Sequence, residues 1–225
     1  MKKLFVVSTY FILSFAQQIL AQSFEIESVA NIRGCSTQQA NAIRSAELAV
    51  ASRLQFVMTE FPKFNLEYVH QNFLIPTNRP FTSGSKENQN YEIYLQKMLS
   101  VFSRMQNATQ SGVNFECKDS NDEPQCQNGE VMAYVLFYGA HADPNMYLCS
   151  GYFAANHGDA DRVETMFHEL SHYAADTDDL ALSWLSPKNF QILRAPDDAY
   201  HIQNFSAGLI QDNLRRQIWF WNWPK

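Results

Sequence analysis

Hydrophobic residues recur at helical spacing in three segments of the chain. The first runs from Ala40 to Phe61 and follows Ser36 and Gln39, whose spacing is typical of the capping box that starts a helix. The second runs from about Asn88 to Gln106 and carries one apolar stripe. In the third, the apolar positions are Val163, Met166, Phe167, Leu170 and Tyr173. The pattern therefore predicts three helices, with an irregular connection from Pro62 to Lys86.

Residues typical of β-strands are concentrated in the middle of the chain. The candidate strands are Val113 to Cys117, Val131 to Tyr138 and Met146 to Cys149, with a polar loop from Lys118 to Asn128. A further short helix is expected from Asp197 to Leu209. We therefore expect an α+β fold that is mostly helical, with a small antiparallel sheet next to the helix that contains Val163 to Tyr173.

The N-terminus has the form of a secretory signal peptide. Two lysines follow Met1, an apolar run extends from Leu4 to Phe15, and the small residue Ala21 ends the segment. We expect cleavage after Ala21 and a secreted protein, extracellular or periplasmic in transit; the alternative is an uncleaved anchor. Residues 22–225 then form one domain, and no other segment has the length and hydrophobicity to cross a bilayer.

Three of the 4 tryptophans lie in the C-terminal tail, at about residues 210–225. Such a tail either folds back onto the core or presents an apolar patch to a partner or membrane, and folding back is the better expectation because exposed indoles are unfavourable in water. The formal net charge of −6 disfavours nucleic acid as a partner, since phosphate binding needs a basic surface.

All 4 cysteines, Cys35, Cys117, Cys126 and Cys149, follow the predicted signal peptide. An even number in an exported chain predicts two disulfides, and the sequence alone leaves three pairings open. Zinc binding by these cysteines is disfavoured because no Cys-x-x-Cys spacing occurs.

The segment His168-Glu169-Leu170-Ser171-His172 has the spacing of a metal-binding motif. Residues four apart on a helix lie one turn above each other, at roughly 6 Å, so both imidazoles can face one metal ion. Zn²⁺ takes two histidine nitrogens and a third ligand, and a catalytic site keeps the fourth position for water. Glu169 is then placed to act as the general base. The competing interpretation is that these are ordinary histidines of a helix.

Beyond this motif, the chain resembles the aspzincin metallopeptidases, the deuterolysin and peptidyl-Lys metalloendopeptidase group. The resemblance covers most of residues 30 to 206 and implies a zincin-like fold. It is carried by Cys35 before a long helix, the pair Cys117 and Cys126, Ala133-Tyr134-Val135, Met146 to Phe153, Glu164 to His172, and Thr177-Asp178-Asp179.

The resemblance implies one Zn²⁺ per chain, with Asp179 as the ligand that joins His168 and His172. This chain has Asp176 where the family has a glycine, and Asp178 stays an alternative ligand because it has the spacing used by metzincin-like enzymes. The resemblance also implies disulfides between Cys35 and Cys117 and between Cys126 and Cys149.

Two departures from the family pattern affect catalysis and specificity. Leu182 and Ser183 stand where the family has a Tyr-Gly pair whose tyrosine stabilises the oxyanion; the candidate replacements are Tyr173, Tyr200 and His201. Relatives that cleave before lysine carry an Asp-x-x-Glu-like segment, and residues 197–201 keep acids without the glutamate. Asp198 is the candidate substrate-binding residue, and a lysine preference on the P1′ side stays open.

These observations predict a secreted, monomeric zinc metalloendopeptidase that acts on peptide or protein substrates. The alternative, from a different class, is a catalytically silent zinc-binding protein that binds a host or cell-surface partner. The lost tyrosine favours the silent protein, whereas Glu169 favours the enzyme, since a structural zinc needs no general base.

Overall fold

A computed structural model describes residues 29–61, 86–119, 123–127, 131–139, 141–179, 197–200 and 202–210 of the chain, with side chains in the second range described from residue 93. The predicted signal peptide, most of the predicted connection from Pro62 to Lys86 and the tryptophan-rich tail beyond residue 210 lie outside these ranges. So do Leu182, Ser183 and His201.

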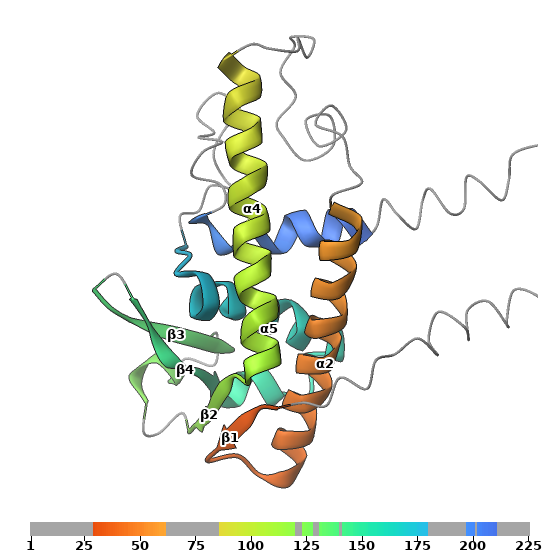
Figure 1. Cartoon of the computed structure of the whole chain (residues 1–225). Helices are drawn as coiled ribbons and strands as arrows, with labels where there is room; N and C mark the ends of the chain where they lie inside the picture. Colours follow the sequence, from red (N-terminus) through yellow and green to blue (C-terminus); the bar gives the residue numbers. More distant parts are fainter. Residues whose placement is uncertain are drawn as a thin grey trace, which may run out of the picture.

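Three long helices form the body of the described fold: α2 (Thr37–Glu60), α4 (Lys86–Ser111) and α5 (Asp159–Ala175). The start of α2 is fixed as the sequence predicts, because the Gln39 amide donates to Ser36 Oγ (3.3 Å) and the Ser36 amide donates to Gln39 Oε1 (2.8 Å). Helix α5 contacts α2, α4 and two strands, so it occupies the centre of the described fold (Figure 1). Residues 199–200 and 202–210 are helical as well.

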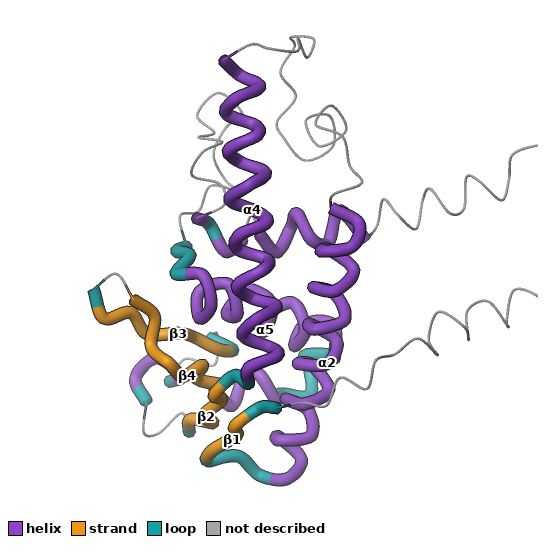
Figure 2. The backbone as a smooth tube through the Cα atoms, viewed as in Figure 1, coloured by secondary structure: helices purple, strands orange, loops and turns teal. Residues whose placement is uncertain are grey.

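The sheet has four strands in the order β1-β2-β4-β3: β1 (Asn31–Arg33), β2 (Asn114–Lys118), β3 (Ala133–Tyr138) and β4 (His141–Cys149). It lies at one end of the helical body (Figure 2). Short 3₁₀ turns follow at Pro124–Cys126 and Ser150–Phe153.

The expectation of an antiparallel sheet is wrong, because the sheet is mixed. Strand β4 pairs antiparallel with β3 but parallel with β2, and β1 pairs parallel with β2. The chain passes from β2 to the edge strand β3 and returns through a hairpin to β4, so β2 and β4 run in the same direction. Strand β1 was not predicted, since three residues carry too little pattern to be recognised.

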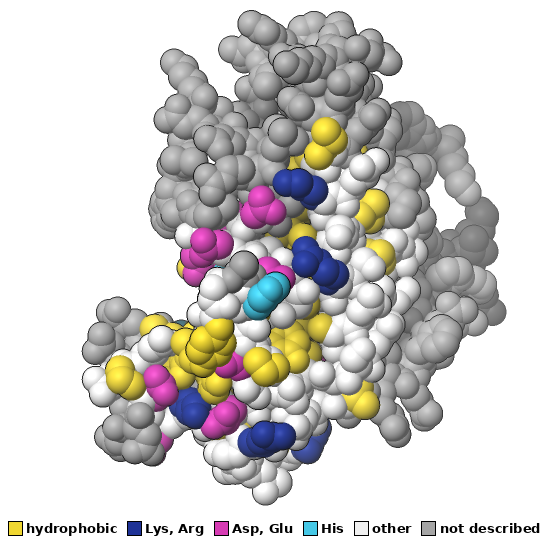
Figure 3. All heavy atoms as spheres, turned by 60° about the vertical axis from the view of Figure 1, so that its left-hand side comes forward, with side chains coloured by type: hydrophobic (Ala, Val, Ile, Leu, Met, Phe, Trp, Pro, Cys, Tyr) yellow, Lys and Arg dark blue, Asp and Glu magenta, His cyan; other side chains and the backbone are white. Residues whose placement is uncertain are grey.

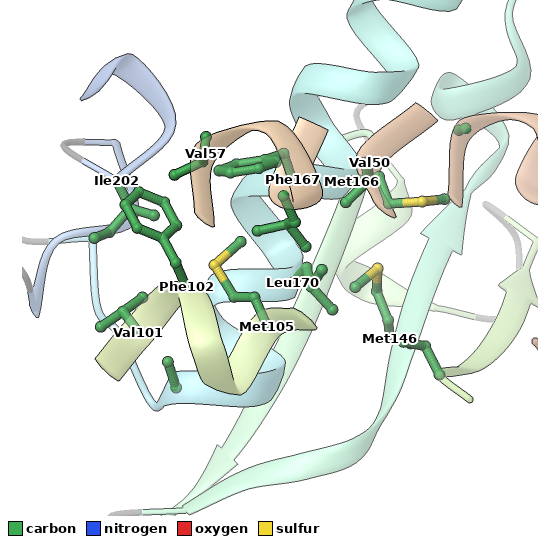
Figure 4. Packing of buried hydrophobic residues seen from close by; sticks show 14 of the residues in the cluster. Val50, Val57, Val101, Phe102, Met105, Met146, Met166, Phe167, Leu170 and Ile202 are labelled. Atoms are coloured by element: carbon green, nitrogen blue, oxygen red, sulfur yellow. The ribbon is translucent and has the colours of Figure 1, made fainter. Parts of the chain in front are cut away.

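One apolar core joins the helices to the sheet. Phe102 and Met105 of α4 meet Phe167 and Leu170 of α5, and Met146 of β4 lies in the same cluster (Figure 4). The apolar stripe of α5 therefore faces inward, as its spacing predicts, and burial of such side chains is the main stabilising contribution to the fold.

A charged contact fixes α5 one turn before the histidine motif. Arg53 of α2 is buried, donates to Glu164 Oε1 at 2.6 Å and lies with its guanidinium carbon 4.3 Å from the centre of the Phe167 ring. The Gln203 carbonyl also accepts from Arg53, at 2.9 Å. Arg53 thus links α2, α5 and the helical segment that begins at residue 199.

Two disulfides hold the sheet to its surroundings. They join Cys35 to Cys117 and Cys126 to Cys149, the pairs that the family resemblance implies. The first bond connects the start of α2 to β2 across 82 residues of sequence. Each bond is expected to contribute about 2–4 kcal/mol, largely by restricting the unfolded chain.

Among the described residues, no helix combines the length and the apolar character needed to cross a membrane.

Candidate metal centre

The histidine motif lies in the last three turns of α5. The helix begins after Gly158, whose amide donates to the Asp161 carboxylate at 2.9 Å, and no glycine or proline interrupts it before Ala175. Every residue from Met166 to His172 is buried. Two imidazoles and the carboxyl group of Glu169 are therefore held inside the fold, where polar groups need partners.

Three candidate ligand atoms converge at this point. The Nε2 atoms of His168 and His172 are 3.1 Å apart, and Asp179 Oδ1 lies 3.1 Å from the first and 3.5 Å from the second. Ligands bound tetrahedrally to zinc at about 2.0–2.2 Å are separated from one another by roughly 3.3–3.6 Å. The three atoms thus form a triangle of the size of one face of a zinc coordination tetrahedron, and the residues present fit the metal.

The ring of His172 is oriented by the segment that follows the helix. Its Nδ1 donates to the Thr177 carbonyl at 2.7 Å, which leaves the lone pair on Nε2 for a metal. The Thr177 hydroxyl is 2.7 Å from the Ser171 hydroxyl, which in turn donates to the His168 carbonyl at 2.8 Å. Ser171 and Thr177 therefore support the site without touching a metal, a role that sequence reasoning missed.

The ring of His168 is held by packing. Its Nδ1 is buried and has no hydrogen-bond partner in the part of the chain that the structure describes. The Tyr200 ring lies against it, with ring centres 4.4 Å apart, and the His172 ring meets it edge to face at 4.8 Å. Tyr200 thus lies at the site. It is one of the three residues that the sequence offers as replacements for the oxyanion tyrosine of the family.

A sharp turn after α5 directs Asp179 toward the histidines. Asp176 ends the helix in the left-handed conformation, with φ 53°, and its amide donates to the His172 carbonyl at 3.1 Å. Its Oδ1 also accepts from the Ala142 amide of β4 at 3.0 Å. Glycine, asparagine and aspartate tolerate this conformation best, which explains why an aspartate can stand where the family has a glycine.

The same turn separates the roles of the two following aspartates. Asp178 pairs through its backbone: its amide donates to the Asp197 carbonyl (2.8 Å), and its carbonyl accepts from the Ala199 amide (3.1 Å). Its Oδ1 accepts from the Asp179 amide at 2.8 Å. The Asp179 side chain, 53% exposed, is the one whose carboxylate meets both histidines.

The charges of the site affect one another. Hydrogen bonds from the His168 and His172 imidazoles hold the pKa of Asp179 well below its usual range. Burial, which leaves Glu169 only 7% exposed, raises the pKa of that carboxyl group. Burial acts to lower the pKa of His172, but the contact with Asp179 and the charge of Glu169 outweigh it and raise that pKa. The two carboxylates thus favour a positive charge between them.

Glu169 lies beside the ligand triangle. Its carboxylate and the ring nitrogens of His168 and His172 are all within 4.8 Å of one another. Asp179 Oδ1 already forms the third corner of the triangle. The Glu169 carboxylate is therefore better placed to reach a water beside a bound metal than to act as a third ligand. The arrangement suits a general base.

The predicted substrate-binding residue, Asp198, lies near the site through its backbone, but its side chain is buried. Its side chain is 0% exposed, and residues 178 and 198 form a parallel bridge that brings the segment before Tyr200 next to Asp179. Asp197 is on the surface, with its Oδ2 3.8 Å from Lys97 Nζ. The acidic segment therefore adjoins the site through its backbone.

One residue near the histidines has no sequence signal of its own. Phe137, on the edge strand β3, meets the His172 ring edge to face at 5.9 Å and is 40% exposed. Apolar side chains are grouped on the lower half of the face in Figure 3, with charged side chains between them. Strand pairing and the packing of β3 against α5 bring Phe137 to the site, so no local pattern could identify it.

Comparison with known proteins places the chain in a family. A family model described as lysine-specific metallo-endopeptidase, of the aspzincin M35 group, matches residues 82–200, more than half of the chain. The chain belongs to the aspzincin metallopeptidase family. The predicted enzyme class, a zinc metalloendopeptidase, is thereby confirmed, and peptides or proteins are the substrates of this class.

Two further comparisons with known proteins add no functional assignment. No curated protein sequence matches this aspzincin significantly. Among solved structures, a zinc peptidase from Grifola frondosa is similar over 77% of this chain and 99% of its own, with 19% sequence identity and a TM-score of 0.49.

The turn at Asp176 gives a prediction about stability. Asp176→Val places a β-branched residue in the left-handed conformation and removes the acceptor of the Ala142 amide, so we expect a loss of about 2–3 kcal/mol of unfolding free energy. Asp176→Asn keeps both features and should stay within about 0.5 kcal/mol of the wild type. Urea unfolding measures both, and equal stability of the valine variant would refute the role given to this turn.

Proposed function

We propose that this chain is a secreted zinc metalloendopeptidase in which His168, His172 and Asp179 hold one Zn²⁺ and Glu169 is the general base. The observation that carries the proposal is the triangle of Nε2, Nε2 and Oδ1 atoms, with separations of 3.1, 3.1 and 3.5 Å. When bound, Zn²⁺ supplies a Lewis acid that polarises the scissile carbonyl and acidifies water.

The protein's own residues perform the proton transfers. Glu169 takes a proton from the attacking water and later delivers it to the leaving amine, so that one carboxyl group serves both halves of the reaction. Burial raises the pKa of this carboxyl group above its usual value, which favours its taking up a proton. The bond from His172 Nδ1 to Thr177 keeps the facing nitrogen available as a ligand.

The proposal extends to residues that the structure does not describe. Residues 1–21 act as the signal peptide, residues 22–225 form a single domain, and the mature protein is a monomer. The two disulfides support export, because such bonds persist in oxidising compartments.

For the substrate, we propose a preference for lysine on the P1′ side. Two observations support it: the matching family model is described as lysine-specific, and the acidic segment containing Asp198 adjoins the third ligand through its bridge to Asp178. The exposed acid of this segment is Asp197, since Asp198 is buried, and a lysine ammonium that reaches the Asp197 carboxylate gains a favourable charge interaction.

Digestion of casein or of a lysine-rich peptide tests activity and preference together. We expect cleavage that a chelator abolishes and zinc restores, with mass spectrometry of the products placing lysine after most cut bonds. Absence of any cleavage by the zinc-loaded protein would favour the silent binding protein. Cleavage without lysine enrichment would refute the specificity alone.

A further inference from the structure

Peptide hydrolysis places negative charge on the carbonyl oxygen of the scissile bond, and a preorganised hydrogen-bond donor aimed at that oxygen lowers the barrier substantially. The donor must be near the metal ligands, accessible to substrate and not already bonded elsewhere. Glu169 does not serve, because it acts as the base in the proposed function, on which this inference rests.

The buried hydroxyl groups beside the histidines do not meet these conditions. Ser171 and Thr177 are 0% and 1% exposed, and their hydroxyls bond to each other at 2.7 Å. Ser171 in addition donates to the His168 carbonyl. Both groups are fully engaged in holding the helix end and the ligand loop together, and substrate cannot reach them.

Tyr173 does not meet the conditions either. It lies one residue beyond His172 on α5, so it points about 100° away from the ligand around the helix axis. Its side chain packs against the hydrophobic core. It is therefore on a different face of α5 from the metal ligands.

Tyr200 does meet the conditions. Its ring lies against the His168 ring, with centres 4.4 Å apart, and 43% of the residue is exposed. It is carried by the helical segment that follows the bridge between residues 178 and 198, so the same backbone contact that positions Asp179 also positions Tyr200.

We propose that Tyr200 is a catalytic residue whose phenolic hydroxyl donates a hydrogen bond to the carbonyl oxygen of the scissile peptide bond as negative charge develops there. No bond of Tyr200 is made or broken in this step; the hydroxyl keeps its proton throughout. The ring contact with His168 fixes the direction of the phenol, and exposure of the ring leaves the hydroxyl accessible to substrate.

The test is Tyr200→Phe in the zinc-loaded, full-length protein, because this change removes only the hydroxyl and keeps the ring that packs on His168. We expect kcat to fall about 10²-fold with KM within roughly threefold of the wild type, as for loss of one oxyanion donor. Zinc content and the unfolding midpoint should not change. Tyr138→Phe, at an exposed tyrosine of β3, is the matched control and should keep wild-type kcat.

A second readout does not depend on turnover. A phosphinic peptide built on the preferred cleavage sequence mimics the charged oxygen, and Tyr200→Phe should weaken its binding at least tenfold while leaving binding of the cleaved product unchanged. An unchanged kcat, a rise in KM alone, or loss of zinc from the variant would each overturn the assignment. An inactive wild-type protein would instead refute the proposed peptidase function.

Discussion

Replacing Glu169 with glutamine is expected to abolish peptide cleavage while leaving zinc bound. Glutamine has nearly the same shape as glutamate but cannot take a proton from water at neutral pH, and general-base catalysis contributes about 10²–10⁴ in rate. Because Asp179 and the two histidines are the proposed ligands, zinc binding should not depend on Glu169. Metal analysis and a peptide-cleavage assay on the same purified sample check both parts.

His172→Ala is the matched control for this experiment. It removes a ligand together with the hydrogen bond to Thr177, so the variant should lose both zinc and activity. Proteolysis at close to the wild-type rate in pure Glu169→Gln protein would remove Glu169 from the role of base, whatever the metal content.

Separate alanine substitutions at Asp178 and Asp179 should differ strongly in their effect on zinc affinity. Asp179→Ala removes the carboxylate that touches both histidines. We expect it to weaken zinc binding by more than the 10–100-fold that loss of an outer-shell partner costs. Asp178→Ala leaves the triangle intact and removes only the acceptor of the Asp179 amide, so we expect at most a few-fold change.

A competition titration with a zinc-binding dye measures both affinities. Circular dichroism confirms that each variant is folded before the titration. If the Asp178 variant lost the metal and the Asp179 variant kept it, the ligand assignment would be reversed.

The helices could be predicted from the sequence because their signals are local. The capping box at Ser36 and the apolar stripe that ends at Tyr173 each lie within a few turns, and the structure has α2 and α5 at these places. The motif histidines share a face of α5 for the same reason, since residues four apart are always neighbours on a helix.

The rest of the site depends on contacts that no local pattern contains. Whether Asp178 or Asp179 faces the histidines is determined by the left-handed turn at Asp176, and a shift of one residue reverses the answer. Phe137 reaches His172 through strand pairing, and Tyr200 reaches His168 through the bridge between residues 178 and 198. The parallel pairing of β2 with β4 is likewise a long-range property.

An anomalous difference map collected at the zinc absorption edge, from crystals of the protein purified without added metal, tests the central claim most directly. The account predicts one peak per chain about 2.0–2.2 Å from the Nε2 atoms of His168 and His172 and from Asp179 Oδ1. A map with no peak between these three atoms, or with its peak at another group of side chains, would contradict it.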